Sequence, residues 1–283
     1  GQLGRLQERG GRLAEARRTL EQAAAAQPAS VETLLDLARV AHKERDYRGA
    51  LGYLAHARDQ APGDARIHFF FGLVCVDLEL GAEAYTSLQE AVRLDPQNAS
   101  INYAMGGVAL HRRDPSEAIP YFKKYTELRP EDPRGGLALG IATYQAKDFT
   151  SARTSLRAAA DQPPTRAAAA YYLARLAREE NDLDEALRRA REAVEANPAY
   201  ADAWAELGLV QFRRRENGPA EAALRKCLEL EPQSYLGNLH LLMLYERTRD
   251  GREAEQARVF EEIKRVRDEQ AEDFRRVIEI RPY

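Results

Sequence analysis

The chain has little of the chemistry that most active sites require. Its 283 residues include two cysteines, two methionines, one tryptophan and five histidines. No two histidines have the i, i+4 spacing of a zinc-binding helix with a glutamate between them, and no glycine-rich loop follows a strand to hold phosphate. The run His111-Arg112-Arg113-Asp114 resembles a kinase catalytic loop only in its letters, because the rest of that signature is missing. The sequence therefore predicts no catalysis, no metal site and no cofactor.

Long apolar runs and a basic excess are also missing. No stretch is apolar over the roughly 20 residues that a membrane-spanning helix needs, and the net charge is −3. Phosphate binding needs a basic excess on one face, so nucleic acid is not the expected ligand. Hydrophobic residues still make up 44% of the chain, which is typical of a folded protein. We expect a folded chain that has no transmembrane segment.

The repeated feature of the sequence is a spacing of 34 residues. Of the 13 prolines, seven follow one another at this interval, and alanine recurs 12 residues before each of them and once more one period later. The prolines are Pro28, Pro62, Pro96, Pro130, Pro164, Pro198 and Pro232, and the alanines are Ala16, Ala50, Ala84, Ala118, Ala152, Ala186, Ala220 and Ala254. A fixed period of this length predicts a solenoid of stacked helical units.

Each unit predicts two helices joined by a turn. We number a unit from 1 to 34 with the proline at 32, so that the recurring alanine is position 20. Apolar residues at positions 3, 7, 10 and 11 and at 20, 21, 24, 27 and 28 have helical spacing. Position 8 is small in the seven units up to residue 234, and with the alanine at position 20 it predicts a close approach of the two helices. Position 16 is aspartate in five units and predicts a cap for the second helix: Asp46, Asp114, Asp148, Asp182 and Asp250.

One unit matches a known pattern closely. The unit 201–234 carries Trp204, Leu207, Gly208, Ala220, Leu224 and Pro232. In these residues the chain resembles the tetratricopeptide repeat, although Trp204 is its only tryptophan and position 11 is never tyrosine in the seven units up to residue 234. The resemblance implies an all-α, right-handed superhelix of helix-turn-helix repeats, in which a concave groove receives ligands, usually peptides.

The period divides the chain into a single array of repeats with a helical tail. Apolar spacing continues past the eighth unit, so we expect one long C-terminal capping helix that ends near Arg281 and Pro282. The expected parts are an incomplete repeat at 1–30, full repeats at 31–64, 65–98, 99–132, 133–166, 167–200 and 201–234, a divergent repeat at 235–268 and a tail at 269–283.

The outward side of the first helices is unusually apolar in the middle of the array. Helical-wheel geometry places positions 2, 5, 6, 9, 12 and 13 opposite the packing direction, and we call this side the first-helix face. Its candidate peptide-binding residues are Phe69, Phe70, Leu73, Val76, Tyr103, Leu110, Leu137, Ile141, Tyr144, Tyr171, Tyr172 and Arg175. An apolar face of this size predicts an interaction site. The alternative is that some of these side chains pack between neighbouring repeats.

Charged residues flank this apolar set. Arg39 and Lys43 precede it, and Arg175, Arg178 and Arg213 lie at its other end. They favour a ligand whose apolar anchors are flanked by acids, but acidic residues are interspersed and ordinary solvation is the alternative. The lysine and asparagine pattern with which one subgroup of the resembled family clamps a terminal carboxylate is absent, so we expect apolar side chains to select the ligand.

We therefore predict a non-catalytic scaffold that binds a protein or peptide segment through apolar anchors, as an adaptor or assembly factor. One alternative is an interaction domain of a longer enzyme or receptor, since the chain begins at Gly1 without methionine. Another is a self-assembling protein that forms a homodimer through its C-terminal tail. Cys75 and Cys227 fall at packing positions and are expected to be buried thiols. The sequence slightly favours the cytoplasm. It does not decide the compartment, because an upstream signal peptide would be missing from a processed chain.

Overall fold

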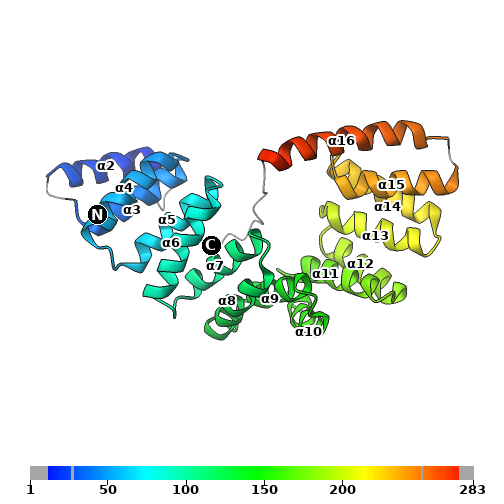
Figure 1. The fold of residues 1–283 in the computed structure, drawn as a ribbon, viewed down its shortest axis with the longest axis horizontal. Helices are drawn as coiled ribbons and strands as arrows, with labels where there is room; N and C mark the ends of the chain where they lie inside the picture. Colours follow the sequence, from blue (N-terminus) through cyan, green and yellow to red (C-terminus); the bar gives the residue numbers. More distant parts are fainter. Residues whose placement is uncertain (1–11, 27–28, 250, 274–283) are drawn as a thin grey trace. The chain divides into compact units, whose positions relative to one another are not determined.

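The computed structural model describes residues 12–26, 29–249 and 251–273, and within these ranges it contains 15 helices and no strand (Figure 1). The first helices of the units are α3 Val31–Lys43, α5 Ala65–Asp77, α7 Ala99–His111, α9 Pro133–Gln145, α11 Arg166–Glu179, α13 Ala201–Arg213 and α15 Tyr235–Thr248. The second helices are α2 Leu13–Ala26, α4 Tyr47–Gln60, α6 Gly81–Leu94, α8 Pro115–Leu128, α10 Phe149–Ala160, α12 Leu183–Ala196, α14 Asn217–Leu230 and α16 Glu253–Asp273. The predicted all-helical architecture is confirmed.

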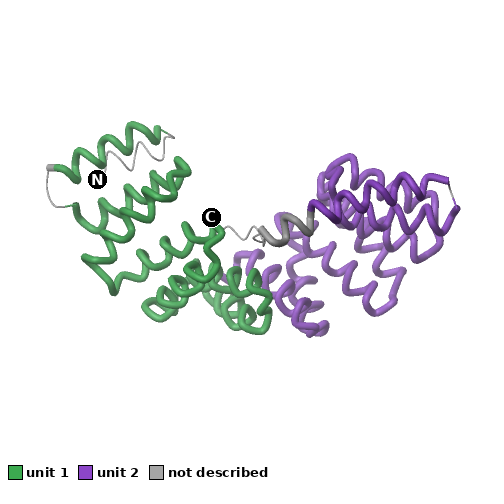
Figure 2. Tube along the Cα trace, turned by 45° about the horizontal axis from the view of Figure 1, so that its top comes forward, with its two compact units in different colours: residues 1–128, 277–283 green, residues 129–276 purple. Residues whose placement is uncertain are grey.

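The helices form two compact units, α2 to α8 in unit 1 and α9 to α16 in unit 2 (Figure 2). Within each unit, every first helix packs against the second helix that follows it and, where the unit has one, against the second helix before it. The first helices α9, α11, α13 and α15 also contact one another in succession, as do α5 and α7. Unit 2 therefore presents the outward sides of four neighbouring first helices on one face.

Close packing in four of the helix pairs depends on a glycine at position 8. A Cβ added to Gly72 would lie 2.7 Å from the side chain of Leu88, and one added to Gly106 would lie 2.8 Å from Phe122. A Cβ added to Gly140 would lie 2.7 Å from Leu156, and one added to Gly208 would lie 2.6 Å from Leu224. In these four pairs, the residue that faces the glycine is at position 24 of the second helix, and it is large and fully buried. The alanines at position 20 from Ala16 to Ala220 are buried as well, as the predicted close approach requires.

The last helix pair departs from this pattern. Ala254 is exposed, so the prediction that every recurring alanine lies in a helix contact was wrong there. Helix α16 begins at Glu253, two positions later in the unit than the other second helices, and position 8 of this pair is Leu242. In this pair Phe260 is buried instead, with its ring 5.1 Å from that of Tyr235. The predicted end of the tail helix near Arg281 lies outside the described residues.

The first helices from α3 to α13 end in the same kind of turn, and α15 shares its left-handed residue. Position 15 has a positive φ of 50 to 65° in all seven turns, at Arg45, Glu79, Arg113, Lys147, Asn181, Arg215 and Arg249. In the six turns where it is described, the N–H of position 16 then donates to the carbonyl of position 11, as Asp46 does to Ala41 at 2.8 Å. This is a Schellman closure of the first helix. It uses no glycine, although the left-handed conformation is costly for other residues.

The predicted aspartate caps start four of the second helices. The Oδ1 atoms of Asp46, Asp114, Asp148 and Asp182 accept from the backbone N–H three residues later at 2.9 to 3.1 Å. Asp250 lies outside the described residues. Leu80 and Glu216 occupy position 16 in two other units and give no side-chain cap.

The periodic prolines follow the ends of the second helices. Helices α4, α6, α8, α12 and α14 each end two residues before their proline, and α10 ends at Ala160, four residues before Pro164. The earlier end of α10 has a local cause, because Pro163 excludes the residue before it from helical geometry. Pro28 lies outside the described residues.

A leucine at Ala118 should be far more damaging than a leucine at Ala254. Ala118 is fully buried between the paired helices, so Ala118→Leu overpacks the contact and should lower the free energy of unfolding by about 1–3 kcal/mol. Ala254 holds the same position but is exposed, and the same substitution should change stability by less than about 0.5 kcal/mol. Urea denaturation followed by circular dichroism measures both. Equal losses would contradict the packing described for position 20.

Supplying the missing cap at Leu80 should stabilise the protein. Leu80 has the backbone angles of the capped turns, with φ −82° and ψ 71° against −82° and 68° at Asp46, and it is 39% exposed. Leu80→Asp should raise the free energy of unfolding by about 1 kcal/mol, measured as a higher melting temperature. Leu80→Ala is the control, because it removes the exposed side chain without adding a cap. A gain of the same size from alanine would show that capping is not the cause.

Candidate functional site

In unit 1, the predicted binding residues divide into partly open and buried side chains. Phe69, Phe70, Leu73 and Val76 on α5 are half-buried, whereas Tyr103 and Leu110 on α7 are buried. The Tyr103 ring lies 4.7 Å from that of Tyr125 and 5.7 Å from that of Phe122, both on α8. Tyr103 is therefore a packing residue of its own helix pair, so an alanine there would disturb the fold itself.

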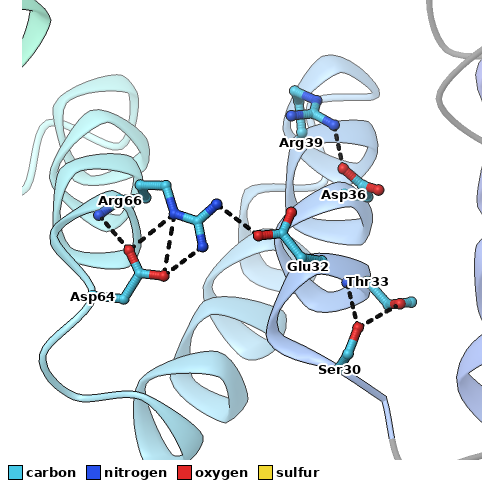
Figure 3. A network of polar contacts seen from close by, with 7 residues as sticks. All are labelled: Ser30, Glu32, Thr33, Asp36, Arg39, Asp64 and Arg66. Carbon is cyan, nitrogen blue, oxygen red and sulfur yellow. Dashed lines mark hydrogen bonds and ion pairs between the residues drawn. The ribbon is translucent and has the colours of Figure 1, made fainter. Parts of the chain in front are cut away.

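Two arginines on the first-helix face of unit 1 are paired with carboxylates. Arg66, at the start of α5, donates to Glu32 on α3 at 2.6 Å and to its own capping residue Asp64 at 2.7 Å (Figure 3). On α3, Arg39 pairs with the buried Asp36 one turn earlier. Arg39, one of the two predicted flanking charges at this end, is therefore engaged within its own helix.

In unit 2, Leu137, Ile141, Tyr172 and Arg175 are half-buried and Tyr144 and Tyr171 are buried. Leu137 and Tyr172 pack against one buried cluster, so the predicted residues of α9 and α11 meet in space. The expectation of an outward-facing apolar surface holds only for the half-buried residues. The side chains of Tyr144 and Tyr171 are covered by the protein itself, because neighbouring first helices bring aromatic rings together.

Three tyrosine rings surround the guanidinium of Arg175. Its Cζ lies 5.3 Å from the ring centroid of Tyr144, 5.5 Å from Tyr171 and 5.7 Å from Tyr172. The rings also contact one another, with Tyr172 at 5.7 Å from Tyr144 and 5.1 Å from Tyr171. Cation-π attraction of this kind fixes both the charge and the rings. Together with Tyr200, described next, we call these residues the tyrosine-arginine cluster.

Tyr200 completes the cluster and was not among the predicted site residues. It is the N-cap residue of α13, outside any helical pattern, and its ring lies 5.2 Å from that of Tyr171. Burial raises the pKa of both tyrosines, which therefore stay neutral. Asp202, two residues further on, is half-buried, and burial raises the pKa of its carboxyl while the Arg175 charge opposes the rise. A helical pattern cannot identify Tyr200, because the residue precedes the helix.

Charges are buried next to this cluster. Arg178 donates to Glu206 on α13 at 2.5 Å, and both side chains are largely buried. His240 on α15 is 7% exposed, and its Nδ1 has no hydrogen-bond partner among the described residues. Burial lowers the pKa of His240 to about 4, with smaller contributions from the charges of Arg178 and Arg213. His240 is therefore neutral at pH 7.

Apolar side chains become exposed again at the far end of unit 2. Leu236 and Met243, at positions 2 and 9 of α15, are 38% and 37% exposed. These positions belong to the first-helix face, although neither residue was predicted as part of the site. Across α9 to α15 this face therefore presents half-buried Leu137 and Ile141, then the tyrosine-arginine cluster, and finally Leu236 and Met243.

Nothing in the described part of the chain suggests a catalytic or metal centre. Those residues contain no group of three or more histidine, cysteine, aspartate or glutamate side chains that could hold a metal ion. Cys75 and Cys227 are buried free thiols, as predicted, and burial raises the pKa of Cys75 to about 11. Of the helices that the structure describes, none has the combined length and hydrophobicity of a bilayer-crossing segment.

Comparison with known proteins identifies the family. Family models described as tetratricopeptide repeat match residues 9–70, 76–133, 137–188 and 173–235. The chain belongs to the tetratricopeptide repeat family. Proteins of this fold are generally scaffolds for protein-protein interaction, and the helix pairs described above are its repeating units.

Several relatives share parts of the chain. It is 24% identical over 253 residues to the BBSome complex member BBS4 homolog of Drosophila melanogaster, covering 82% of this chain and 50% of that protein. It is 43% identical over 63 residues to the peroxisomal targeting signal receptor of Pichia angusta, covering 22% of this chain and 11% of the receptor. The chain spans half or less of the length of these curated relatives.

Solved structures share the fold. The type IV pilus biogenesis factor PilW is similar with a TM-score of 0.65 and 20% identity, over 75% of this chain and 98% of PilW. PilF of Pseudomonas aeruginosa gives 0.62 and 24% identity, over 71% of this chain and 92% of PilF. At these identities, the two likenesses establish the helical solenoid alone.

The buried His240 should make stability depend on pH. Its pKa is about 4 in the folded protein against about 6.5 in the unfolded chain. The unfolded state therefore binds more protons between these values, and stability should fall as the pH drops from 6.5 to 4, by about 2–3 kcal/mol. Chemical denaturation at pH 7.5, 6 and 5 measures the slope. His240→Leu should flatten it, whereas His56→Leu, at an exposed histidine, should leave it unchanged. Equal slopes in wild type and His240→Leu would contradict the assignment.

Proposed function

We propose that this chain is a non-catalytic adaptor or assembly factor that binds an extended peptide segment of a partner protein on the first-helix face of unit 2. The segment would run across α9, α11, α13 and α15. The tyrosine-arginine cluster would lie at the centre of the contact, with Leu137, Ile141, Leu236 and Met243 on its two sides.

The observation that carries this proposal is the cluster itself. Tyrosine and arginine are enriched among the residues that dominate binding energies, because each offers a large contact area together with a hydrogen-bonding group. Tyr172 and Arg175 are half-buried and held by neighbouring rings. Such side chains lose little conformational freedom when a ligand binds, which favours affinity.

The relatives support a binding role without identifying a partner. One is named a targeting signal receptor and another a member of a complex, and both names describe proteins that engage other proteins. The chain covers half or less of each, so an interaction domain of a longer enzyme or receptor remains an alternative. Assembly with a second copy through residues 269–283 is the other alternative.

Peptide binding should depend on Tyr172. We expect the full chain to enrich a set of sequences from a phage-displayed library of 12-residue peptides. Fluorescence anisotropy of a selected peptide should then give a dissociation constant that rises about 30-fold in Tyr172→Ala, as expected for the loss of about 2 kcal/mol at a hot spot. Tyr121→Ala is the matched control, because Tyr121 is a half-buried tyrosine on the second helix α8.

Two results would overturn the proposal. One is the absence of any enriched peptide, and the other is an equal loss of affinity in the two tyrosine variants, with both folded by circular dichroism. The self-assembly alternative is separated by the mass in solution with and without residues 269–283. A monomer in both cases excludes assembly through the tail.

A further inference from the structure

Arg175 differs from most arginines of the first-helix face in what it contacts; Arg213 also lacks an ion pair among the described residues, but its side chain is exposed. Arg178 is paired with Glu206, Arg66 with Glu32 and Asp64, and Arg39 with Asp36. Arg247 donates to the carbonyl oxygen of Phe212 at 2.7 Å. Arg175 forms no ion pair with any carboxylate in the described part of the chain, and it donates one hydrogen bond, to the Tyr171 hydroxyl at 3.3 Å.

The Arg175 guanidinium is therefore a fixed cation with unused donors. A guanidinium carries five N–H donors in a planar fork that fits a carboxylate. Three tyrosine rings hold it in place, and the side chain is only half-exposed. A charge-assisted hydrogen bond in such a partly desolvated position is stronger than one made in open water.

Apolar subsites lie on both sides of this cation. Leu137 and Ile141 are on α9, the first helix before α11, and Leu236 and Met243 are on α15, two first helices after it. Neighbouring packed helices are about 10 Å apart, and an extended peptide advances about 3.3–3.6 Å per residue. One helix therefore corresponds to about three peptide residues. The apolar subsites correspond to about three residues on one side of Arg175 and about six on the other.

We infer that the ligand of unit 2 is an extended peptide in which one aspartate or glutamate binds Arg175, with an apolar residue about three positions away on one side and another about six positions away on the other. This inference rests on the proposed function and names the chemistry of its partner. The carboxylate is taken to be that of a side chain within the segment, because the apolar subsites require the peptide to continue on both sides.

Asp202 limits where acids are accepted. It lies on α13, between the two ends of the proposed path; its carboxyl makes no ion pair or side-chain hydrogen bond within the described residues, and the Arg175 charge acts on it. A second acid that follows the first by about three residues would face this carboxyl and be repelled. The ligand should therefore carry one acid, at the Arg175 subsite, and a neutral or basic residue at the next.

The test compares the peptides selected by variants of the full chain. The probe is the same library of 12-residue peptides. Wild type should enrich peptides with one acid at the stated distances from two apolar residues, and changing that acid to its amide should weaken binding about 10- to 100-fold. Arg175→Gln should lose the preference for acid but keep the apolar residues. Arg175→Glu should select lysine or arginine at the same place, and Asp202→Asn should accept a second acid.

Arg157→Gln is the matched control, because Arg157 is exposed on the second helix α10 and its loss changes the net charge equally. It should select the same peptides as wild type. If Arg175 serves only to pack the tyrosines, Arg175→Gln will lower the melting temperature and leave the preference for acid unchanged, which overturns the inference. Enriched peptides that depend on Tyr172 but contain no acid would overturn the inference and leave the proposed function standing. Peptides that match residues 274–283 would instead indicate this chain's own tail as the occupant.

Discussion

The large side chain at position 24 of a second helix occupies the space that a Cβ at position 8 of the facing first helix would need. At Gly106 that atom would lie 2.8 Å from Phe122, and at Gly208 2.6 Å from Leu224. Where it is present, this contact fixes the rotation of the first helix about its axis, and so determines which of its side chains point away from the partner. In unit 2 it orients α9 and α13, whereas α11 packs two small buried residues, Ala174 and Ala190, in the same places.

The same constraint explains why the fold could be predicted from the sequence. It also explains why the exposed surface could be predicted only in part. Prolines, alanines and small residues recur at intervals set by backbone contacts, so their spacing alone indicates paired helices. A helical wheel gives the direction of Tyr103 or Tyr171 relative to its own helix. It does not give the side chains that neighbouring helices place over them, and both residues are buried.

Other features left no signal in the sequence. Position 15 adopts a positive φ in every turn, yet arginine, glutamate and lysine occupy most of these positions, where glycine would have marked the conformation. Tyr200 joins the tyrosine-arginine cluster from the residue before a helix. Ala254 keeps the period of 34 residues but is exposed, in a helix that begins two positions later than the other second helices. None of these three features is marked by a residue type or a spacing in the sequence.

The residue at position 16 lies between two helices and can form a hydrogen bond with each of them. In Asp46, for example, the N–H closes α3 through Ala41 while the carboxylate begins α4 through Gly49. Neither helix of such a hairpin can lose this residue without weakening the other, so the pair rather than the single helix is the smallest cooperative unit of folding. A chain of such units can come apart one hairpin at a time. In the hairpin of α5 and α6 only one of the two bonds is present. The N–H of Leu80 closes α5, but its side chain does not cap α6.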